Sequence, residues 1–251
     1  MVCQPGRVTT RIATANVLYK LPRYDARHAL DLVLAEEPDL VGLQEWYVVR
    51  LPLLRPTGSV RVAPGPVTVP GGSRFQWVTG LGGGNVVGAR ADRYDLLASR
   101  QPWLSLPGPT DRTDRLLNLE PPREATVGVF ADREAGDTVA LISYHLVSGA
   151  VRGASYRSDR PRLVRRHRHE VARLDDLVGE LQADGHRVYA VGDSNHHLQR
   201  LTGLTSAWED REPAPTCGRQ TLDDVHGPGD ATGLRLVTTP SDHLAVVVDR
   251  P

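Results

Sequence analysis

The sequence has little of several features that mark specialised protein classes. Its only two cysteines, Cys3 and Cys217, can form neither a disulfide framework nor a Cys-x-x-Cys metal site. No apolar run approaches the roughly 20 residues that a membrane-spanning helix needs. The N-terminal segment up to Tyr19 lacks the apolar stretch and small-residue cleavage pattern of a signal peptide. Together these absences predict a reduced, cytoplasmic protein with no membrane span.

Net charge is also lacking, because 30 basic side chains balance 30 acidic ones in 251 residues. A composition of 40% hydrophobic and 24% charged residues excludes disordered and fibrous classes. Zero net charge removes the global signature of a nucleic-acid or membrane-surface binder, although it permits a local basic patch. Lys20 is the only lysine. The excess of arginine reflects either GC-rich codons or a use for arginine forks on phosphate, and only local clustering can separate these two interpretations.

Short runs rich in Val, Ile and Thr, bounded by Gly, Pro or Asp, predict many β-strands. The predicted strands are 8–17, 40–44, 60–69, 75–79, 85–89, 126–130, 138–143, 188–191, 234–238 and 244–248. Three- and four-residue periodicity instead predicts helices over 24–37 and 159–184. In the second helix, Asp159 can cap the start, Pro161 suits the first turn and Gly185 suits the end.

The order of these elements predicts the architecture. A strand, a helix and a strand open the chain, and the same order returns at 138–192. Many strands with few helices favour two packed sheets with helices outside. The segments 52–72 and 104–122 are predicted to be loops, and no Pro/Gly/Ser-type linker long enough to separate a pair of domains is present. We therefore expect a single domain over residues 1–251.

Polar side chains follow several predicted strands, where a rigid scaffold can position a site. Taken singly, such a carboxylate or amide is usually a turn or cap residue, and a lone histidine is usually structural. Taken together, crowded carboxylates repel one another unless a hard cation such as Mg²⁺ or Mn²⁺ lies among them. Nearby imidazoles and amides can then hold a phosphate or activate water. The residues are Asn16, Glu45, His145, Asp193, Asn195, Asp223, Asp224, Asp242 and His243.

Six short motifs carry these residues in a familiar order: TANVLY, LQEW, SYHL, GDSN, LDDV and SDH. In this respect the sequence resembles the endonuclease/exonuclease/phosphatase family, the deoxyribonuclease-I-like group that includes abasic-site endonucleases, inositol polyphosphate phosphatases and neutral sphingomyelinases. The resemblance spans residues 11–248. It implies an α/β fold, namely a four-layered αββα sandwich of two packed, mostly antiparallel β-sheets with helices outside.

The resemblance also implies a metal site and a water-activating group. Glu45 would hold the divalent metal, Mg²⁺ or Mn²⁺, helped by Asn16 and Asp242. Asp193 would orient or deprotonate the attacking water, and Asn195 would donate a hydrogen bond to a phosphate oxygen.

Two histidines have implied roles at the phosphate. His243 would face it and be oriented by an aspartate of the LDDV motif, where the register favours Asp223 over Asp224. His145 would stabilise the pentavalent phosphate or assist the leaving group. Ser194 stands where the family usually has an aromatic residue, a position that we expect to pack rather than to react.

A local basic cluster lies in residues 152–173, which contain eight arginines and two acidic residues, a local charge of +6. One interpretation is a solvated helix face. The other is a clamp for further substrate phosphates, for which Arg152, Arg157 and Arg160 are better placed than the arginines further along the predicted helix. Nucleic acid, a phosphorylated small molecule and an anionic lipid head group would all be attracted to such a cluster.

The leading functional hypothesis is a Mg²⁺- or Mn²⁺-dependent phosphodiesterase of nuclease type. The alternative is a phosphomonoesterase that acts on a small phosphorylated metabolite. A third possibility is a binding scaffold without activity, which the intact set of six residues disfavours, namely Glu45, His145, Asp193, Asn195, Asp242 and His243. The expected partner is a phosphate-ester substrate, either nucleic acid or a phosphorylated small molecule, and no obligate protein partner is evident.

Overall fold

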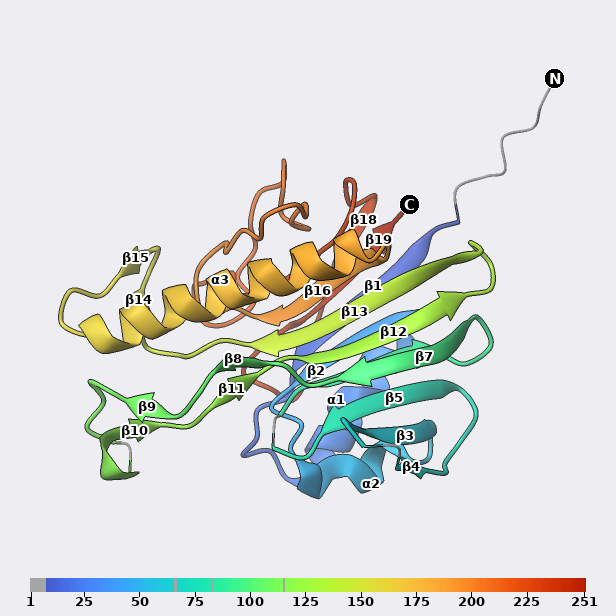
Figure 1. Cartoon of the computed structure of the whole chain (residues 1–251), viewed down its shortest axis with the longest axis horizontal. Coiled ribbons are helices and arrows are strands. Elements are labelled where there is room, and N and C mark those ends of the chain that lie inside the picture. The colour runs from blue at the N-terminus through green and yellow to red at the C-terminus, as the bar shows by residue number, and fades with distance from the viewer. Residues whose placement is uncertain (1–7, 66, 83, 115) are drawn as a thin grey trace.

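The computed structural model describes residues 8–65, 67–82, 84–114 and 116–251, so Cys3 lies outside the described residues. Two large mixed β-sheets form its centre (Figure 1). The eight-stranded sheet has the order β18 (Gly233–Val237), β19 (Ala245–Arg250), β1 (Thr10–Asn16), β2 (Leu40–Gln44), β6 (Val86–Arg90), β5 (Phe75–Gly80), β3 (Gly58–Ala63), β4 (Thr68–Val69). The five-stranded sheet has the order β17 (Asp223–His226), β16 (Arg187–Asp193), β13 (Asp137–His145), β12 (Thr126–Asp132), β7 (Tyr94–Arg100).

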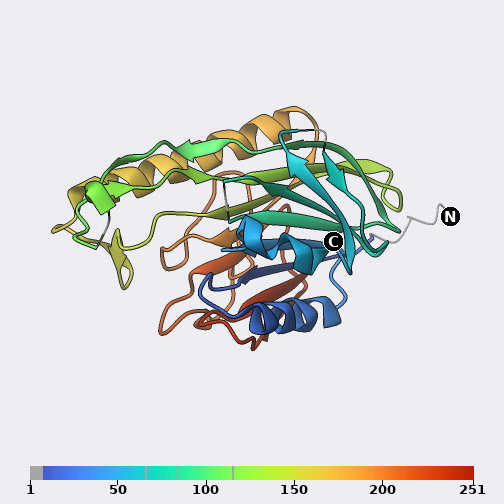
Figure 2. The same cartoon turned by 90° about the horizontal axis from the view of Figure 1, so that it is seen from below.

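Helices cover the outer faces of both sheets, which gives the predicted αββα order (Figure 2). The buried stripe of α1 (Arg23–Ala35) packs on the outer face of the eight-stranded sheet, where Ala13 and Val247 contribute. The stripe of α3 (Pro161–Ala183) packs on the outer face of the five-stranded sheet. Alternate strand residues, such as Ile12 and Val248, point inward instead and pack against the other sheet. The three- and four-residue spacing of apolar residues in the helices and their alternation in the strands thus account for the four layers.

Shorter elements complete the chain. A short helical segment follows β2 and comprises the 3₁₀ helix η1 (Val48–Arg50) and α2 (Leu51–Leu54). Between β7 and β12 the chain forms an arm beside the start of α3 (Figure 1). The arm consists of β8 (Trp103–Ser105), β9 (Gly108–Pro109), η2 (Leu116–Asn118), β10 (Leu119–Glu120) and β11 (Arg123–Glu124). A small hairpin, β14 (Val151–Arg152) and β15 (Ser155–Tyr156), precedes α3.

The structure corrects several details of the sequence prediction. The predicted strand 60–69 is two antiparallel strands, β3 and β4, because Pro64 and Gly65 turn the chain between them. The predicted loop 104–122 contains β9, β10 and the end of β8, and β7, β11 and β17 were not predicted as strands. Asp159 does not cap α3, since its carboxylate pairs with Arg157. Asp111 of the arm accepts hydrogen bonds from the first backbone N–H groups of the helix instead.

A buried polar contact fixes the two sheets against each other below the site. Gln44 at the end of β2 donates to Ser143 Oγ on β13 at 3.0 Å, and Ser143 donates to the Leu43 carbonyl at 3.1 Å. Beside this bridge, a Cβ on Gly42 would lie 2.1 Å from a Val191 methyl carbon, so glycine permits the close approach of the sheets. The ends of β2 and β13, which belong to different sheets, are therefore held close together.

Candidate active site

Strand register brings the predicted residues together. In the eight-stranded sheet β1 and β2 are parallel, with Asn16 opposite Gln44, so Glu45 follows directly beside Asn16. In the five-stranded sheet β13 and β16 are parallel, with His145 opposite Asp193. Antiparallel β17 places Asp223 opposite Asp193. The carboxyl ends of parallel strands share one edge of a sheet, and both such edges meet at this site.

Asn16 links the two carboxylates from different sheets. Its Nδ2 lies 3.0 Å from Asp193 Oδ2 and 3.4 Å from Glu45 Oε1. The backbone N–H of Tyr19 donates to Glu45 Oε2 at 2.7 Å. Glu45 itself has a φ of +57°, a left-handed conformation that is rare for a residue with a long side chain. This strained backbone conformation persists only where neighbouring residues impose it, and such strain is common at functional sites.

The side chain of Arg50 holds the backbone at Glu45 in this conformation. This buried guanidinium donates to the carbonyl oxygens of Val17, Leu18 and Leu21. It also donates to the Glu45 carbonyl at 3.3 Å. One side chain therefore fastens the loop after β1 to the loop after β2. Sequence reasoning missed Arg50, because nothing distinguishes it from the other arginines of an arginine-rich chain.

His243 and Asp223 form a buried pair. His243 Nδ1 lies 2.8 Å from Asp223 Oδ2, and its Nε2 lies 3.9 Å from Asp193 Oδ2. Burial by itself lowers the pKa of His243, but the hydrogen bond and negative charge of Asp223, with the charge of Asp193, outweigh it and raise the pKa to about 12. His243 is therefore an imidazolium at neutral pH, with Nε2 directed toward Asp193.

Asp193 lies between this imidazolium and a second histidine. Burial raises the pKa of Asp193 to about 7, the charge of Asp223 adds to this effect and the charge of His243 opposes it. His145 Nε2 lies 3.5 Å from Asp193 Oδ2. Burial lowers the pKa of His145 well below its ordinary value, and the positive charges of Arg123 and His243 lower it further. The two imidazoles that flank Asp193 thus differ in charge at neutral pH.

Of the other three residues predicted for the site, Asn195 contacts Asp193, whereas Asp224 and Asp242 lie apart from Glu45. Asn195 adopts a φ of +51°, and its backbone N–H donates to Asp193 Oδ1 at 2.7 Å. Asp224 points away from His243 and accepts hydrogen bonds from Ser206 and from the backbone. Asp242 is exposed, and its carboxylate groups with Cys217 and His243 within 4.8 Å rather than with Glu45.

The donor set fits a hard divalent cation. Glu45 and Asp193 offer carboxylate oxygens on either side of Asn16 Nδ2, and oxygen donors are those that Mg²⁺ and Mn²⁺ prefer. Asn16 Oδ1 is buried and, within the described part of the chain, has no hydrogen-bond partner. An orphaned buried acceptor is costly unless a further group binds it. Asp193, Asp223 and His243 also have ligand atoms within 4.8 Å of one another.

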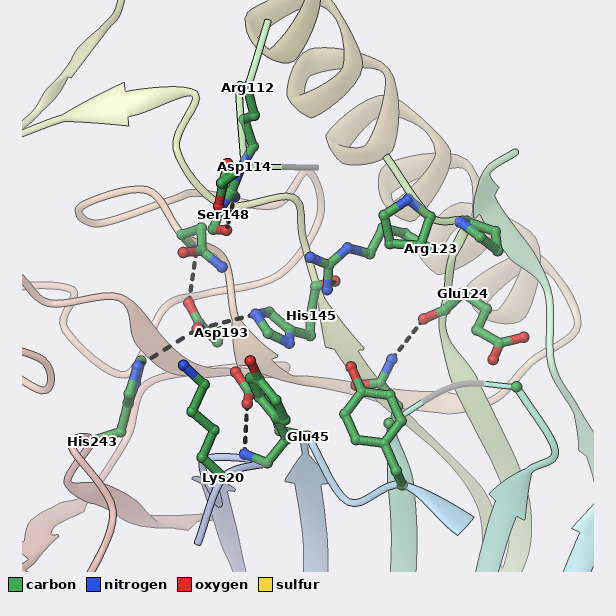
Figure 3. A pocket seen from close by; sticks show the side chains of 18 residues that line it. Lys20, Glu45, Arg112, Asp114, Arg123, Glu124, His145, Ser148, Asp193 and His243 are labelled. Atoms are coloured by element: carbon green, nitrogen blue, oxygen red, sulfur yellow. Dashed lines mark hydrogen bonds and ion pairs between the residues drawn. The ribbon is translucent and has the colours of Figure 1, made fainter. Parts of the chain in front are cut away.

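These side chains line a cavity of about 770 Å³ (Figure 3). Glu45, His145, Asp193, Asn195 and His243 are at its wall, and its arginine and lysine residues, among those that the structure describes, are Lys20, Arg112 and Arg123. Arg152, Arg157 and Arg160 are not among the described residues that line it. Arg157 instead pairs with Asp159 at 2.5 Å. Of the cavity cations, only Lys20 had a sequence signal, as the sole lysine directly after the TANVLY motif.

The architecture is that of the endonuclease/exonuclease/phosphatase, or deoxyribonuclease-I-like, fold, which confirms the fold class predicted from the motifs. A solved endonuclease/exonuclease/phosphatase from Bacteroides vulgatus matches with a TM-score of 0.66 at 16% identity over 97% of this chain and 98% of that chain. D. rerio TDP2, solved in complex with a single-strand DNA product, matches with a TM-score of 0.62 at 16% identity over 96% and 98%. A mannosyl-6-phosphatase from Bacteroides thetaiotaomicron matches with a TM-score of 0.64 at 16% identity over 95% and 98%.

Sequence comparison gives a different result from structure comparison. No protein-family model and no curated protein matches the chain. At the low identities above, the structural likeness establishes the fold alone. Among the described residues, no helix has both the length and the apolar character needed to span a membrane.

Proposed function

We propose that this protein is a divalent-metal-dependent hydrolase of phosphate esters. The observation that carries the proposal is that Asn16 joins Glu45 and Asp193 in one hydrogen-bonded group. Asp193 in this group lies between two histidines, neutral His145 and cationic His243. Structural neighbours include an enzyme with a DNA product and a sugar phosphatase, which supports phosphate-ester chemistry without naming the ester. We treat residues 1–251 as one catalytic domain, because β1 and β19 from opposite ends of the chain pair directly.

Each side chain has a distinct task in this proposal. Glu45 and Asn16 would hold Mg²⁺ or Mn²⁺, whereas the third predicted ligand, Asp242, lies apart from Glu45 beside Cys217 and His243 and has no role in this proposal. When bound, the cation would neutralise negative charge on the phosphate. Asp193, whose pKa is about 7, suits the acceptance of a proton from the attacking water. His243, held as an imidazolium by Asp223, would donate a hydrogen bond from Nε2 to a phosphate oxygen.

Two further groups would act on the phosphate. Neutral His145 would donate a hydrogen bond to the pentavalent phosphate or to the leaving oxygen. Asn195 would donate through its side-chain amide, whose Nδ2 lies 3.0 Å from the Leu146 carbonyl and still carries a second hydrogen. Phosphoryl transfer depends chiefly on positioning and charge neutralisation, which this arrangement supplies without a covalent intermediate.

The leading substrate class is a phosphodiester, as in a nuclease. Nucleic acid would then extend out of the cavity, where Arg152 and the other arginines of the 152–173 segment could contact its backbone. If so, the affinity should fall steeply with salt concentration.

A phosphomonoester of a small metabolite is the second candidate, and one observation favours it. The three cations Lys20, Arg112 and Arg123 lie inside the cavity, whereas the arginines predicted to bind substrate lie outside it. Cations gathered inside a concave site suit a small substrate that is mostly enclosed.

Two chromogenic esters test the proposal. Bis-p-nitrophenyl phosphate reports diester hydrolysis and p-nitrophenyl phosphate reports monoester hydrolysis, each measured with Mg²⁺, with Mn²⁺ and after EDTA treatment. We expect EDTA to abolish hydrolysis and Glu45→Gln or His243→Ala to lower kcat/KM by about 10²-fold or more. Exposed Glu212→Gln is the control. Full activity in both site variants would refute the proposed site.

A further inference from the structure

One cavity residue has no task in the chemistry proposed above. Glu124 on β11 lines the cavity, although only 6% of the residue is exposed. Within the described part of the chain, no hydrogen bond or ion pair reaches its carboxylate. Burial alone raises the pKa of Glu124 to about 7, and no neighbouring charge offsets that effect. The carboxylate oxygens of Glu124 are not among the buried atoms without a partner, so they are accessible from the cavity, where a bound ligand can donate hydrogen bonds to them.

The backbone around Glu124 is firmly held, so the carboxyl has a fixed place. Asn85 Nδ2 donates to the Glu124 carbonyl at 2.6 Å, and Thr126 Oγ1 donates to the Asn85 carbonyl at 2.9 Å. β11 also pairs with β8, with Glu124 opposite Trp103. A carboxyl on such a rigid support can discriminate between ligands, because it cannot follow a misplaced group.

Two glycines keep the space beside Glu124 open. A Cβ on Gly82 would lie 3.4 Å from Glu124 Oε1. A Cβ on Gly84 would lie 3.0 Å from the Glu45 Cα and 3.2 Å from the Tyr47 ring. We call the part of the cavity lined by Tyr47, Gly82, Gly84, Asn85 and Glu124 the side lobe. The side lobe adjoins the proposed metal-binding residue Glu45 through Gly84.

The position of the side lobe relative to Asp193 and His243 suits the organic part of a phosphate ester. Figure 3 shows Arg123 reaching toward His145, with Glu124 on the other side of Arg123 from Asp193 and His243. Asp193 and Glu124 line the same cavity, so an ester whose phosphate lies near Asp193 can extend toward Glu124. Since a carboxylate repels a further phosphate, the group that occupies the side lobe should be uncharged or a hydrogen-bond donor.

The chemistry of Glu124 favours hydroxyl groups. A substrate ammonium would need the ionised carboxylate, whereas a hydroxyl can donate to the carboxylate and accept from the acid. Both forms are present near neutral pH, because the pKa of Glu124 is about 7.

We propose that Glu124 determines specificity by accepting hydrogen bonds from the hydroxyl groups of a polyhydroxylated alcohol, a sugar or a ribose, esterified to the phosphate. This inference rests on the proposed function for its reaction and adds the substrate class. Tyr47 supplies an apolar face beside those hydroxyls, an arrangement that suits the mixed surface of a sugar ring.

Paired substrates that differ only in hydroxyl groups provide the test. Glucose 6-phosphate is compared with cyclohexylmethyl phosphate, and adenosine 5′-phosphate with its 2′,3′-dideoxy analogue. If the wild-type protein hydrolyses diesters only, the 4-nitrophenyl diesters of the same four alcohols replace them. The readout is the ratio of kcat/KM within each pair, for the wild type, Glu124→Gln, Glu124→Asp and the exposed control Glu212→Gln, with folding checked by circular dichroism.

We expect the wild type and Glu212→Gln to prefer the hydroxylated member of one pair. Glu124→Gln should reduce that preference about tenfold or more, because hydrogen bonds to charged groups are the strong ones. The affected pair identifies sugar or ribose as the source of the hydroxyls. An equal ratio in the wild type and Glu124→Gln overturns the inference. So does a Glu124-dependent preference for O-phosphoethanolamine over both hydroxylated esters.

A failure of the proposed function remains distinguishable. If the wild type hydrolyses no ester, calorimetric titration with glucose 6-phosphate and adenosine 5′-phosphate tests recognition by itself. Weaker binding to Glu124→Gln than to the wild type then supports the role of Glu124. Equal binding, or no binding of either probe to the wild type, overturns it.

Discussion

Replacing Asp193 with asparagine should stabilise the metal-free protein while abolishing its activity. Asp193 is 2% exposed, and burial together with the charge of Asp223 makes its ionisation in the folded state costly. The rise of its pKa from 3.8 to about 7 corresponds to a penalty of about 4 kcal/mol once the group is ionised, at about 1.4 kcal/mol per pKa unit. Asparagine has nearly the same shape and carries no charge.

The hydrogen bonds that Asp193 accepts reduce the stabilisation expected from Asp193→Asn only in part. Asp193 accepts from the Asn195 N–H at 2.7 Å and from Asn16 Nδ2 at 3.0 Å. An asparagine oxygen can keep the first bond. Its amide nitrogen would face Asn16, whose Oδ1 has no partner among the described residues and can turn to accept the new donor. Allowing about 1 kcal/mol for imperfect geometry, we expect a net stabilisation of roughly 2–3 kcal/mol.

The assay is calorimetric unfolding in EDTA at pH 5 and pH 8. Because the pKa is raised in the folded state, the contribution of Asp193 to stability is present below pH 3.8 and is lost as the pH rises through about 7. Asp193→Asn should therefore raise Tm by roughly 4–12 °C at pH 8 and by less at pH 5. Mg²⁺ should stabilise the wild type more than the variant.

A matched control is available in the neighbouring strand. Asp224 is also buried, but its carboxylate accepts hydrogen bonds from Ser206 Oγ and from the backbone N–H of Ala207. Asp224→Asn should lower Tm at pH 8, because a satisfied acceptor is lost. The reasoning is wrong if Asp193→Asn destabilises the protein at pH 8, or if its effect is the same at both pH values.

Two further changes test the supports of the site. Asp223→Asn removes the hydrogen bond and charge that raise the pKa of His243 to about 12, so the variant should lose kcat/KM as the pH rises through a new, lower imidazolium pKa that the wild type does not show below pH 9. Histidine NMR titration measures it directly, and an unshifted His243 resonance would contradict the prediction. Arg50→Met removes donors to the carbonyls of Val17, Leu18, Leu21 and Glu45 and should cost about 3 kcal/mol or more in urea unfolding. It should also weaken Mg²⁺ binding, whereas exposed Arg219→Met should change neither quantity.

Asn16, Glu45, His145 and Asp193 could be predicted from the sequence because each ends or directly follows a buried β-run. Asp223 begins β17, and Asp242 and His243 precede β19, so these three depended on the order of the motifs. The order of the motifs anticipated the fold, yet it left Asp223 and Asp224 nearly equivalent. Strand geometry separates them, since successive side chains of β17 point to opposite faces. Asp223 contacts His243, and Asp224 turns to Ser206. That distinction depends on the pairing of β17 with β16, which no local pattern contains.

The arm could not be predicted, although it supplies several residues of the cavity wall. Residues 104–122 show neither helical nor strand periodicity, and the short strands β8 to β11 form only because they pair with one another. A two-residue strand has no intrinsic signal, since its stability comes from its partner. Arg112 therefore enters the cavity from a segment predicted as a loop, and Arg123 and Glu124 enter from β11 directly after it, which was not predicted as a strand.

The arginine-rich segment shows why a local sum of charge is a weak guide to a binding site. Of its eight arginines, Arg157, Arg162, Arg166 and Arg173 pair with acidic residues, and three of these partners lie within five residues. In each pair the acidic partner offsets the charge of the arginine, and only the Arg166–Glu170 pair is buried. The other three pairs are partly or fully exposed, and exposed ion pairs contribute little to stability. Among the described residues, the cavity instead collects Lys20, Arg112 and Arg123 and opposes them with Glu45, Asp114, Asp193 and Glu124, and Arg112 itself pairs with Asp114 at 2.8 Å. A balanced cavity of this kind selects a substrate by the positions of its groups rather than by its total charge, which is the behaviour that the paired esters would detect.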